Sequence, residues 1–212
     1  EILELKYYWF KKFKLGNIHL LISRTGWSSE FGYEMFLLKT SDGDELYETL
    51  MQEGKDLGLH PGHTSTIRRI EGGMLSYHSD MDINTNPFEL GLDKFIDLEK
   101  SFDFVGKDAL IKIKKLGIQR KQVGLIIECE KLKGPNTKKW SIFKNQQRIG
   151  QVTSAVYSPR LEQNIALAMV DIEYSDINTS LKIKIDDNLV DAKITVKPFF
   201  DPNKLIAKKS SI

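Results

Sequence analysis

One glycine-bounded segment gathers side chains that could bind a flat, hydrogen-bonding ligand. Residues 24–34 read Arg-Thr-Gly-Trp-Ser-Ser-Glu-Phe-Gly-Tyr-Glu and lead into a strand-like run. Trp27 offers a flat face for an aromatic ring, and Glu30 offers a carboxylate that can accept the paired N–H donors of an aminopyrimidine. That bidentate contact favours pterins and purines. A simple turn with an exposed tryptophan is equally compatible with these residues.

A second segment, residues 67–77, places two arginines beside a pair of glycines. Small residues permit close approach by a ligand or a neighbouring segment, and an arginine such as Arg69 can anchor an acidic tail. Tyr77 can line an aromatic wall. The alternative is an ordinary helix whose arginines pair with Glu71 or with other carboxylates, and the sequence leaves both interpretations open.

The other reactive residue types form no recognisable catalytic or metal-binding pattern. Neither a carboxylate cluster nor a cysteine pair completes a ligand set around the histidines, so we predict no metal. The sequence has no GxSxG, P-loop or GxGxxG motif, which argues against hydrolase, nucleoside triphosphatase and Rossmann functions. The single cysteine, Cys129, ends an alternating apolar run and is interpreted as structural. The four histidines are His19, His60, His63 and His78.

The composition is that of a globular protein. The chain has 212 residues, a length that is ample for a buried core. Of these residues 41% are hydrophobic and 28% are charged, as in an ordinary globular protein. A formal charge of +2 provides no global basic field for nucleic acid or anionic lipid. No stretch approaches the ~20 apolar residues of a membrane span, and none resembles a signal peptide. We therefore expect a cytoplasmic protein that binds neither nucleic acid nor a membrane.

The elements that must position these segments follow from periodicity and turn residues. In the first part, Gly16-Asn17 predicts a hairpin turn, Ser41-Asp42 predicts a capped helix start, and Gly117 predicts a helix end. The expected strands of the first part cover 5–13, 18–23 and 33–38. One helix is expected after Ser41-Asp42, and two more are expected over 66–74 and 107–116, the last with Ala109, Leu110 and Ile113 inward. Residues 80–89 are expected to form an ordered loop.

The second part of the chain changes to short alternating strands separated by turns, which favours a small barrel or sandwich. With a hinge at 115–120, we predict an α+β protein: a partial α/β region over 1–117, then an all-β barrel or sandwich domain over 118–212. The expected strands of the second region are 123–129, 141–144, 149–153, 165–170, 181–185 and 192–196.

These segments resemble the glycine cleavage T-protein (aminomethyltransferase) family, which includes the bacterial dimethylsulfoniopropionate demethylase. Residues 24–34 look like the family's RTGYTGEDGFE, residues 69–82 resemble RLEAGLxLYGxDID, and residues 84–92 match NTNPFExGL. Residues 103–110 are similar to FxGKxAL, and residues 150–168 resemble GxVTSGxxSPxLxxxIAxA. The matches follow one another in order along nearly the whole chain.

The resemblance implies a three-domain enzyme with a central cup for tetrahydrofolate. By position, Glu30 corresponds to the glutamate that binds the pterin, with Tyr33 and Trp27 nearby, and Arg69 and Tyr77 fall in a folate-contacting region. The aspartate credited with catalysis in this family belongs to an N-terminal half that this sequence does not show. That absence, and the start in strand-like sequence, lead us to expect the C-terminal part of an enzyme, with no catalytic residue assigned here.

Two departures from the aminomethyltransferase pattern bear on the substrate. The Trp-Ser-Ser-Glu-Phe run at 27–31 and the His-Pro-Gly-His-Thr-Ser run at 60–65 look closer to the demethylase branch. We therefore expect methyl transfer to tetrahydrofolate from a small zwitterion such as dimethylsulfoniopropionate, whose sulfonium Trp27 could face. The alternatives are aminomethyl transfer from a lipoyl carrier protein and a non-catalytic folate-binding or interaction module.

Overall fold

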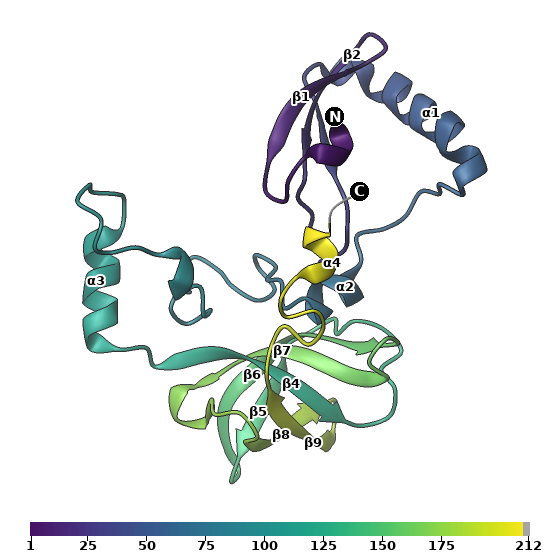
Figure 1. The fold of residues 1–212 in the computed structure, drawn as a ribbon. Coiled ribbons are helices and arrows are strands. Elements are labelled where there is room, and N and C mark those ends of the chain that lie inside the picture. The colour runs from purple at the N-terminus through teal and green to yellow at the C-terminus, as the bar shows by residue number, and fades with distance from the viewer. Residues whose placement is uncertain (210–212) are drawn as a thin grey trace. The chain divides into compact units, whose positions relative to one another are not determined.

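The computed structural model describes residues 1–209, which divide into two compact units. One unit contains residues 1–68 together with the chain from Asp201 onward, and the other contains residues 69–200. The division falls within helix α2 (Thr66–Glu71), between Arg68 and Arg69. Each unit has its own hydrophobic core. Figure 1 shows the elements of both units along the chain.

The first unit is built on a three-stranded antiparallel sheet of order β1-β2-β3, with helix α1 contributing to its core. Alternate residues of the central strand, Ile18, Leu20 and Ile22, point into that core and meet Leu46 of the helix. The predicted hairpin is confirmed, and Gly16 takes the positive φ of 56° that its turn requires. The elements are β1 (Phe10–Leu15), β2 (Ile18–Ser23), β3 (Glu34–Leu37), α1 (Gly43–Gly54) and α4 (Leu205–Lys208).

The first strand starts later than the sequence predicts, at Phe10 instead of residue 5. Tyr8 has a φ of 68°, which interrupts the extended backbone. The chain is held there by local bonds, because the Tyr8 N–H donates to the Arg24 carbonyl and the Arg24 N–H donates to the Trp9 carbonyl. The aromatic residues Tyr7 to Trp9 therefore form a turn, held by these bonds to Arg24, before the strand begins.

The predicted helices are all present, with changes at their ends. Helix α2 stops at Glu71 rather than residue 74, because Gly73 has a φ of 64° and its N–H closes a tight turn on Ile70. Asp42 precedes α1 but makes no side-chain capping bond, contrary to expectation. Helix α3 (Lys107–Leu116) ends at Gly117 as predicted, although Ala109 is exposed rather than inward. The short 3₁₀ turns are η1 (Ile2–Glu4), η2 (Thr40–Asp42), η3 (Lys55–Leu57), η4 (Asp93–Phe95) and η5 (Ile172–Tyr174).

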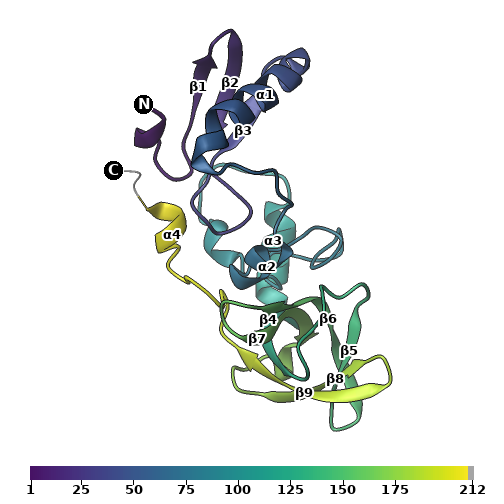
Figure 2. The same ribbon diagram turned by 90° about the vertical axis from the view of Figure 1, so that its right-hand side faces the viewer.

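The second unit contains a closed antiparallel barrel of order β4-β7-β6-β5-β8-β9, which Figure 2 shows from a second side. All six predicted strands are confirmed, and the barrel is closed because β4 pairs with both β7 and β9. The mixed fold class is therefore confirmed, as a barrel rather than a sandwich. The strands are β4 (Arg120–Glu128), β5 (Trp140–Lys144), β6 (Gln147–Ser158), β7 (Gln163–Asp171), β8 (Ser180–Ile185) and β9 (Asn188–Thr195).

Side chains fill the interior of this barrel, as expected for so few strands. Inward residues such as Leu125, Ile142 and Ile183 are fully buried in one continuous cluster. Cys129 packs against that cluster, and burial raises the pKa of its thiol, with the neighbouring Glu130 carboxylate adding to the effect. A thiol with a raised pKa is a poor nucleophile, which agrees with the structural interpretation of this cysteine.

Candidate functional site

The Gly26–Gly32 loop of the first unit is held by Arg24, whose residue is only 2% exposed. Its guanidinium carbon lies 3.9 Å from the centroid of the Phe31 ring and 5.3 Å from that of Tyr33. The same guanidinium donates to the carbonyls of Gly32, at 3.4 Å, and Lys209, at 3.0 Å. A buried cation with aromatic and carbonyl partners therefore fixes the base of the loop.

Glu30 presents its carboxylate from this loop. Its side chain is 32% exposed, and Oε1 lies 3.6 Å from Nε of Arg68. The Glu30 N–H donates to the Ser28 hydroxyl at 3.3 Å, which fixes the backbone beside the carboxylate. Glu30 is thus oriented by the loop and by a neighbouring cation while remaining within reach of a solute.

Ser29 is the strained member of the loop. Its φ is 58°, a left-handed conformation that serine adopts infrequently. Its hydroxyl is buried, and within residues 1–209 it has no hydrogen-bond partner. A buried hydroxyl without a partner costs free energy, which adds to the strain of the left-handed backbone at this position.

The two aromatic residues predicted for this loop have different environments. Trp27 is 40% exposed, so part of its side chain lies at the surface. Tyr33 is half-buried, stacks edge-to-face on Phe31 at 5.6 Å, and donates its hydroxyl to the Ile2 carbonyl at 3.2 Å. Trp27 therefore offers contact area, whereas the hydroxyl of Tyr33 secures the loop.

Arg69 and Tyr77 belong to the second unit. The Arg69 side chain is 7% exposed; Nη1 donates to Asp80 Oδ2 at 2.9 Å and Nη2 donates to the Ser154 hydroxyl at 2.8 Å. Nη1 also reaches the Met74 carbonyl, at 3.2 Å. Tyr77, in contrast, is 52% exposed and lies edge-on to His78. The structure thus gives Arg69 a buried structural role beside its predicted ligand contact, and leaves Tyr77 accessible.

Trp27 and Glu30 lie in the Gly26–Gly32 loop and Tyr33 follows it directly, and their joint role in ligand binding stays a prediction. Sequence reasoning missed Arg24 and Asp80, which hold the two predicted segments in shape. Arg24 opens the recognised motif, so its place next to the glycine loop was a usable signal. Asp80 also lies in a recognised segment, but its contacts with Thr153 and Ser154 could not be foreseen because they come from a distant part of the sequence.

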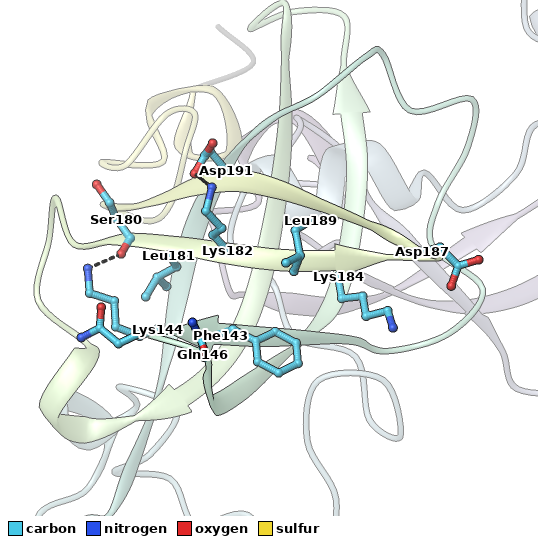
Figure 3. Close-up of a pocket in the computed structure, with 11 residues that line it drawn as sticks. Phe143, Lys144, Gln146, Ser180, Leu181, Lys182, Lys184, Asp187, Leu189 and Asp191 are labelled. Atoms are coloured by element: carbon cyan, nitrogen blue, oxygen red, sulfur yellow. Dashed lines mark hydrogen bonds and ion pairs between the residues drawn. The ribbon is translucent and has the colours of Figure 1, made fainter.

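The barrel has a pocket of about 720 Å³ on the outer side of β5, β8 and β9 (Figure 3). Two of its lysines are already engaged: Lys144 donates to the Ser180 carbonyl and Lys182 pairs with Asp191, both at 2.7 Å. None of the sequence-predicted ligand residues lines it. Within residues 1–209 no group of His, Cys, Asp and Glu side chains could hold a metal ion, and no helix has the length and apolar character of a membrane span.

Lys197, on the segment after β9, has an amine whose pKa is lowered. Burial lowers the pKa of its amine to about 8; the Asp80 carboxylate opposes this shift and the Lys121 ammonium adds to it. Its Nζ donates to the Gln122 side-chain oxygen. Because the folded state releases this proton near pH 8 and an unfolded lysine holds it to about 10.5, stability should rise as the pH increases between those values.

We therefore expect the free energy of unfolding to increase by about 2 kcal/mol more in the wild type than in Lys197→Met between pH 7.5 and pH 10. Urea unfolding of both proteins at the two pH values measures this difference. Since the other titrating groups are common to both proteins, equal changes in the two would contradict the low pKa of Lys197.

Comparison with known proteins matches both parts of the chain to one family. Residues 1–100 match the GCVT N-terminal domain, and residues 120–201 match the glycine cleavage T-protein C-terminal barrel domain. The crystal structure of glycine cleavage system aminomethyltransferase T from Bartonella henselae superposes with a TM-score of 0.78 at 21% identity, covering 94% of this chain and 54% of that one. This similarity supports the fold.

Relatives in sequence are named aminomethyltransferase. The protein from Caldanaerobacter subterraneus subsp. tengcongensis is 33% identical over 207 residues, covering 96% of this chain and 54% of the relative. Those from Thermotoga maritima and Listeria monocytogenes serotype 4b are each 35% identical, covering 93% and 88% of this chain and 53% and 50% of theirs. The chain spans about half the length of the curated relatives it matches. By these matches along both of its parts, the chain belongs to the glycine cleavage T-protein family.

Proposed function

We propose that this chain supplies the pterin-binding loop of a tetrahydrofolate-dependent aminomethyltransferase. The observation that carries the proposal is the loop around Glu30, where a carboxylate that is 32% exposed is held beside Arg68. An aminopyrimidine edge has paired N–H donors for this carboxylate. The residues present therefore fit a pterin.

Each residue of the loop has a distinct part in this proposal. Glu30 accepts the paired N–H donors of the pterin, while Arg68 orients its carboxylate from 3.6 Å. Trp27 covers one face of the ring, and Tyr33 keeps the loop closed through its bond to the Ile2 carbonyl. Tetrahydrofolate, when bound, supplies the nitrogen that accepts the one-carbon unit. Arg69 and Tyr77 of the second unit remain predicted folate contacts.

Aminomethyl transfer is preferred here to methyl transfer from a sulfonium. The relatives with 33–35% identity are named aminomethyltransferases, which supports the alternative raised by the sequence rather than the demethylase. The Trp27 run that favoured the demethylase departs from the family pattern without identifying a donor. On this proposal the donor is an aminomethyl group on a lipoyl carrier protein, and the reaction takes place in the cytoplasm.

Calorimetric titration of the chain with tetrahydrofolate tests the proposal directly. Saturable binding with one site supports it, and a parallel titration of the Thermotoga maritima relative provides the positive control. Binding by neither this chain nor the full product of its gene, under conditions in which the relative binds, would overturn the assignment of the loop. Binding without transfer of an aminomethyl group would instead favour a non-catalytic folate-binding module.

Glu30→Ala should weaken tetrahydrofolate binding by roughly 1.5–3 kcal/mol, the scale of a hydrogen bond to a charged group. The matched control is Glu53→Ala, which removes an exposed glutamate of α1 in the same unit. Calorimetry on both variants measures the difference, with far-ultraviolet circular dichroism to verify folding. An unchanged affinity in a folded Glu30→Ala protein would remove Glu30 from the site.

A further inference from the structure

The carboxylate of Asp80 accepts hydrogen bonds from four residues of the second unit. Its side chain is fully buried, with 0% exposure. Oδ2 accepts from Arg69 Nη1 and from the Ser76 N–H, both at 2.9 Å. Oδ1 lies 2.6 Å from the Thr153 hydroxyl and 2.7 Å from the Ser154 hydroxyl. A buried carboxylate with this many partners fixes the position of every group around it.

These bonds join a surface turn to the barrel. The turn runs from Ser76 to Met81 and is closed by the Asp80 N–H donating to the Ser76 carbonyl and the His78 N–H donating to the Met81 carbonyl, both at 2.8 Å. His78 has a φ of 71°, which reverses the chain. Thr153 and Ser154 belong to β6, so Asp80 connects the turn to a rigid strand.

Tyr77 lies in this turn, between Ser76, which the Asp80 carboxylate holds, and His78, which a backbone bond within the turn holds. Its neighbour Ser76 donates its N–H to Asp80, and its neighbour His78 is bonded to Met81. Tyr77 itself is 52% exposed and its ring rests against the His78 ring, with centroids 4.4 Å apart. The backbone on both sides is therefore held while about half of the Tyr77 side chain is exposed.

We propose that Asp80 is a positioning residue for ligand binding, which holds the Ser76–Met81 turn against β6 so that Tyr77 is presented in one orientation. The ligand-binding part rests on the proposed tetrahydrofolate function. Asp80 does not contact the ligand in this proposal; it acts through the backbone of Ser76. Pre-organisation of this kind strengthens binding because the turn need not be ordered when the ligand arrives.

The test compares Asp80→Asn with Glu89→Gln. Glu89 is also a buried carboxylate of the same unit, bonded to Arg120 at 2.8 Å and to the Asn86 N–H at 3.0 Å, so its variant controls for neutralising a carboxylate of this unit away from the turn. Hydrogen exchange of the amides of the Ser76–Met81 turn is the first readout. Asp80→Asn should release their protection, and Glu89→Gln should leave it as in the wild type. Equal protection in the two variants would overturn the proposal.

Tetrahydrofolate affinity is the second readout, measured as a double-mutant cycle with Tyr77→Ala. Asp80→Asn should weaken binding about tenfold in the wild type and by less than about twofold when Tyr77 is already alanine. Additive losses would show that Asp80 acts on general stability and would overturn the positioning role.

The proposal can still be tested if Asp80→Asn does not fold or if the wild-type chain binds no tetrahydrofolate. Should Asp80→Asn fail to fold, Ser154→Ala removes one donor to the same carboxylate, and its smaller effects should depend on Tyr77 in the same way. Should neither the wild-type chain nor the full product of its gene bind tetrahydrofolate, the proposed function and its ligand role for Tyr77 fail. The exchange comparison then still decides whether Asp80 holds the turn.

Discussion

Gly150→Ala is expected to destabilise the barrel by about 2–4 kcal/mol, through overpacking against main-chain atoms. A β-carbon at this position would lie 2.2 Å from the Met169 carbonyl oxygen and 2.8 Å from the Val170 α-carbon. Both atoms belong to β7, which is paired with β6 on this side of the barrel. Because the obstacles are backbone, no rotamer change relieves the contact, and the β6–β7 ladder must open locally.

The matched control for this prediction is Gly134→Ala, in the connection between β4 and β5. An added β-carbon there meets no atom within 4 Å, so its free energy of unfolding should stay close to that of the wild type. Urea unfolding of the two variants and the wild type, followed by circular dichroism, measures the contrast. Equal stabilities would mean that β6 and β7 are not as closely packed at Gly150 as the structure has them.

The barrel could be predicted from the sequence because short apolar strands follow one another closely with turns between them, and some of them alternate between inward apolar and outward polar residues. In β8, for example, Leu181 and Ile183 are buried while Lys182 and Lys184 are exposed. Closure could not be predicted in the same way. It depends on β4 pairing with β9, which lies more than 60 residues later in the chain, and no local pattern encodes that partner.

The ends of elements in the first unit were predicted less well, for a physical reason. Composition suggested a strand from residue 5, but the bonds that Tyr8 and Trp9 exchange with Arg24 override the strand preference of aromatic residues. The end of α2 was similarly misplaced, because Gly73 adopts a positive φ and closes the turn on Ile70. Glycine lowers helix stability, and here a pair of them terminates the helix.

In the candidate site too, some features could be predicted from the sequence and others could not. Trp27 and Glu30 are selected by residue type and by the glycines around them, and their role in binding stays a prediction. The buried environment of Arg69 could not be identified, since its partners Asp80 and Ser154 lie 11 and 85 residues away in the sequence. An arginine beside glycines looks the same whether it binds a ligand or a distant carboxylate.

Arg69→Met should therefore cost about 3–5 kcal/mol of folding free energy, the usual loss when one partner of a buried ion pair is removed. Methionine has a similar length, so little of the effect comes from an empty volume. The main cost is the Asp80 carboxylate, which is fully buried and would lose its charged partner. Adding Asp80→Asn to Arg69→Met should recover part of the loss, because a neutral amide needs no counter-charge.

The matched control for Arg69→Met is Arg120→Met. Arg120 also pairs with a buried carboxylate, Glu89, at 2.8 Å, but its own side chain is 39% exposed, so solvent screens the pair and the loss should be nearer 1 kcal/mol. Unfolding in urea measures both variants, and tetrahydrofolate titration separates stability from binding. A wild-type unfolding curve for Arg69→Met, together with lost affinity, would contradict the structural role and make Arg69 a ligand residue alone. A large loss of stability would instead mean that any contact of Arg69 with folate is made by a guanidinium already held in place by Asp80 and Ser154.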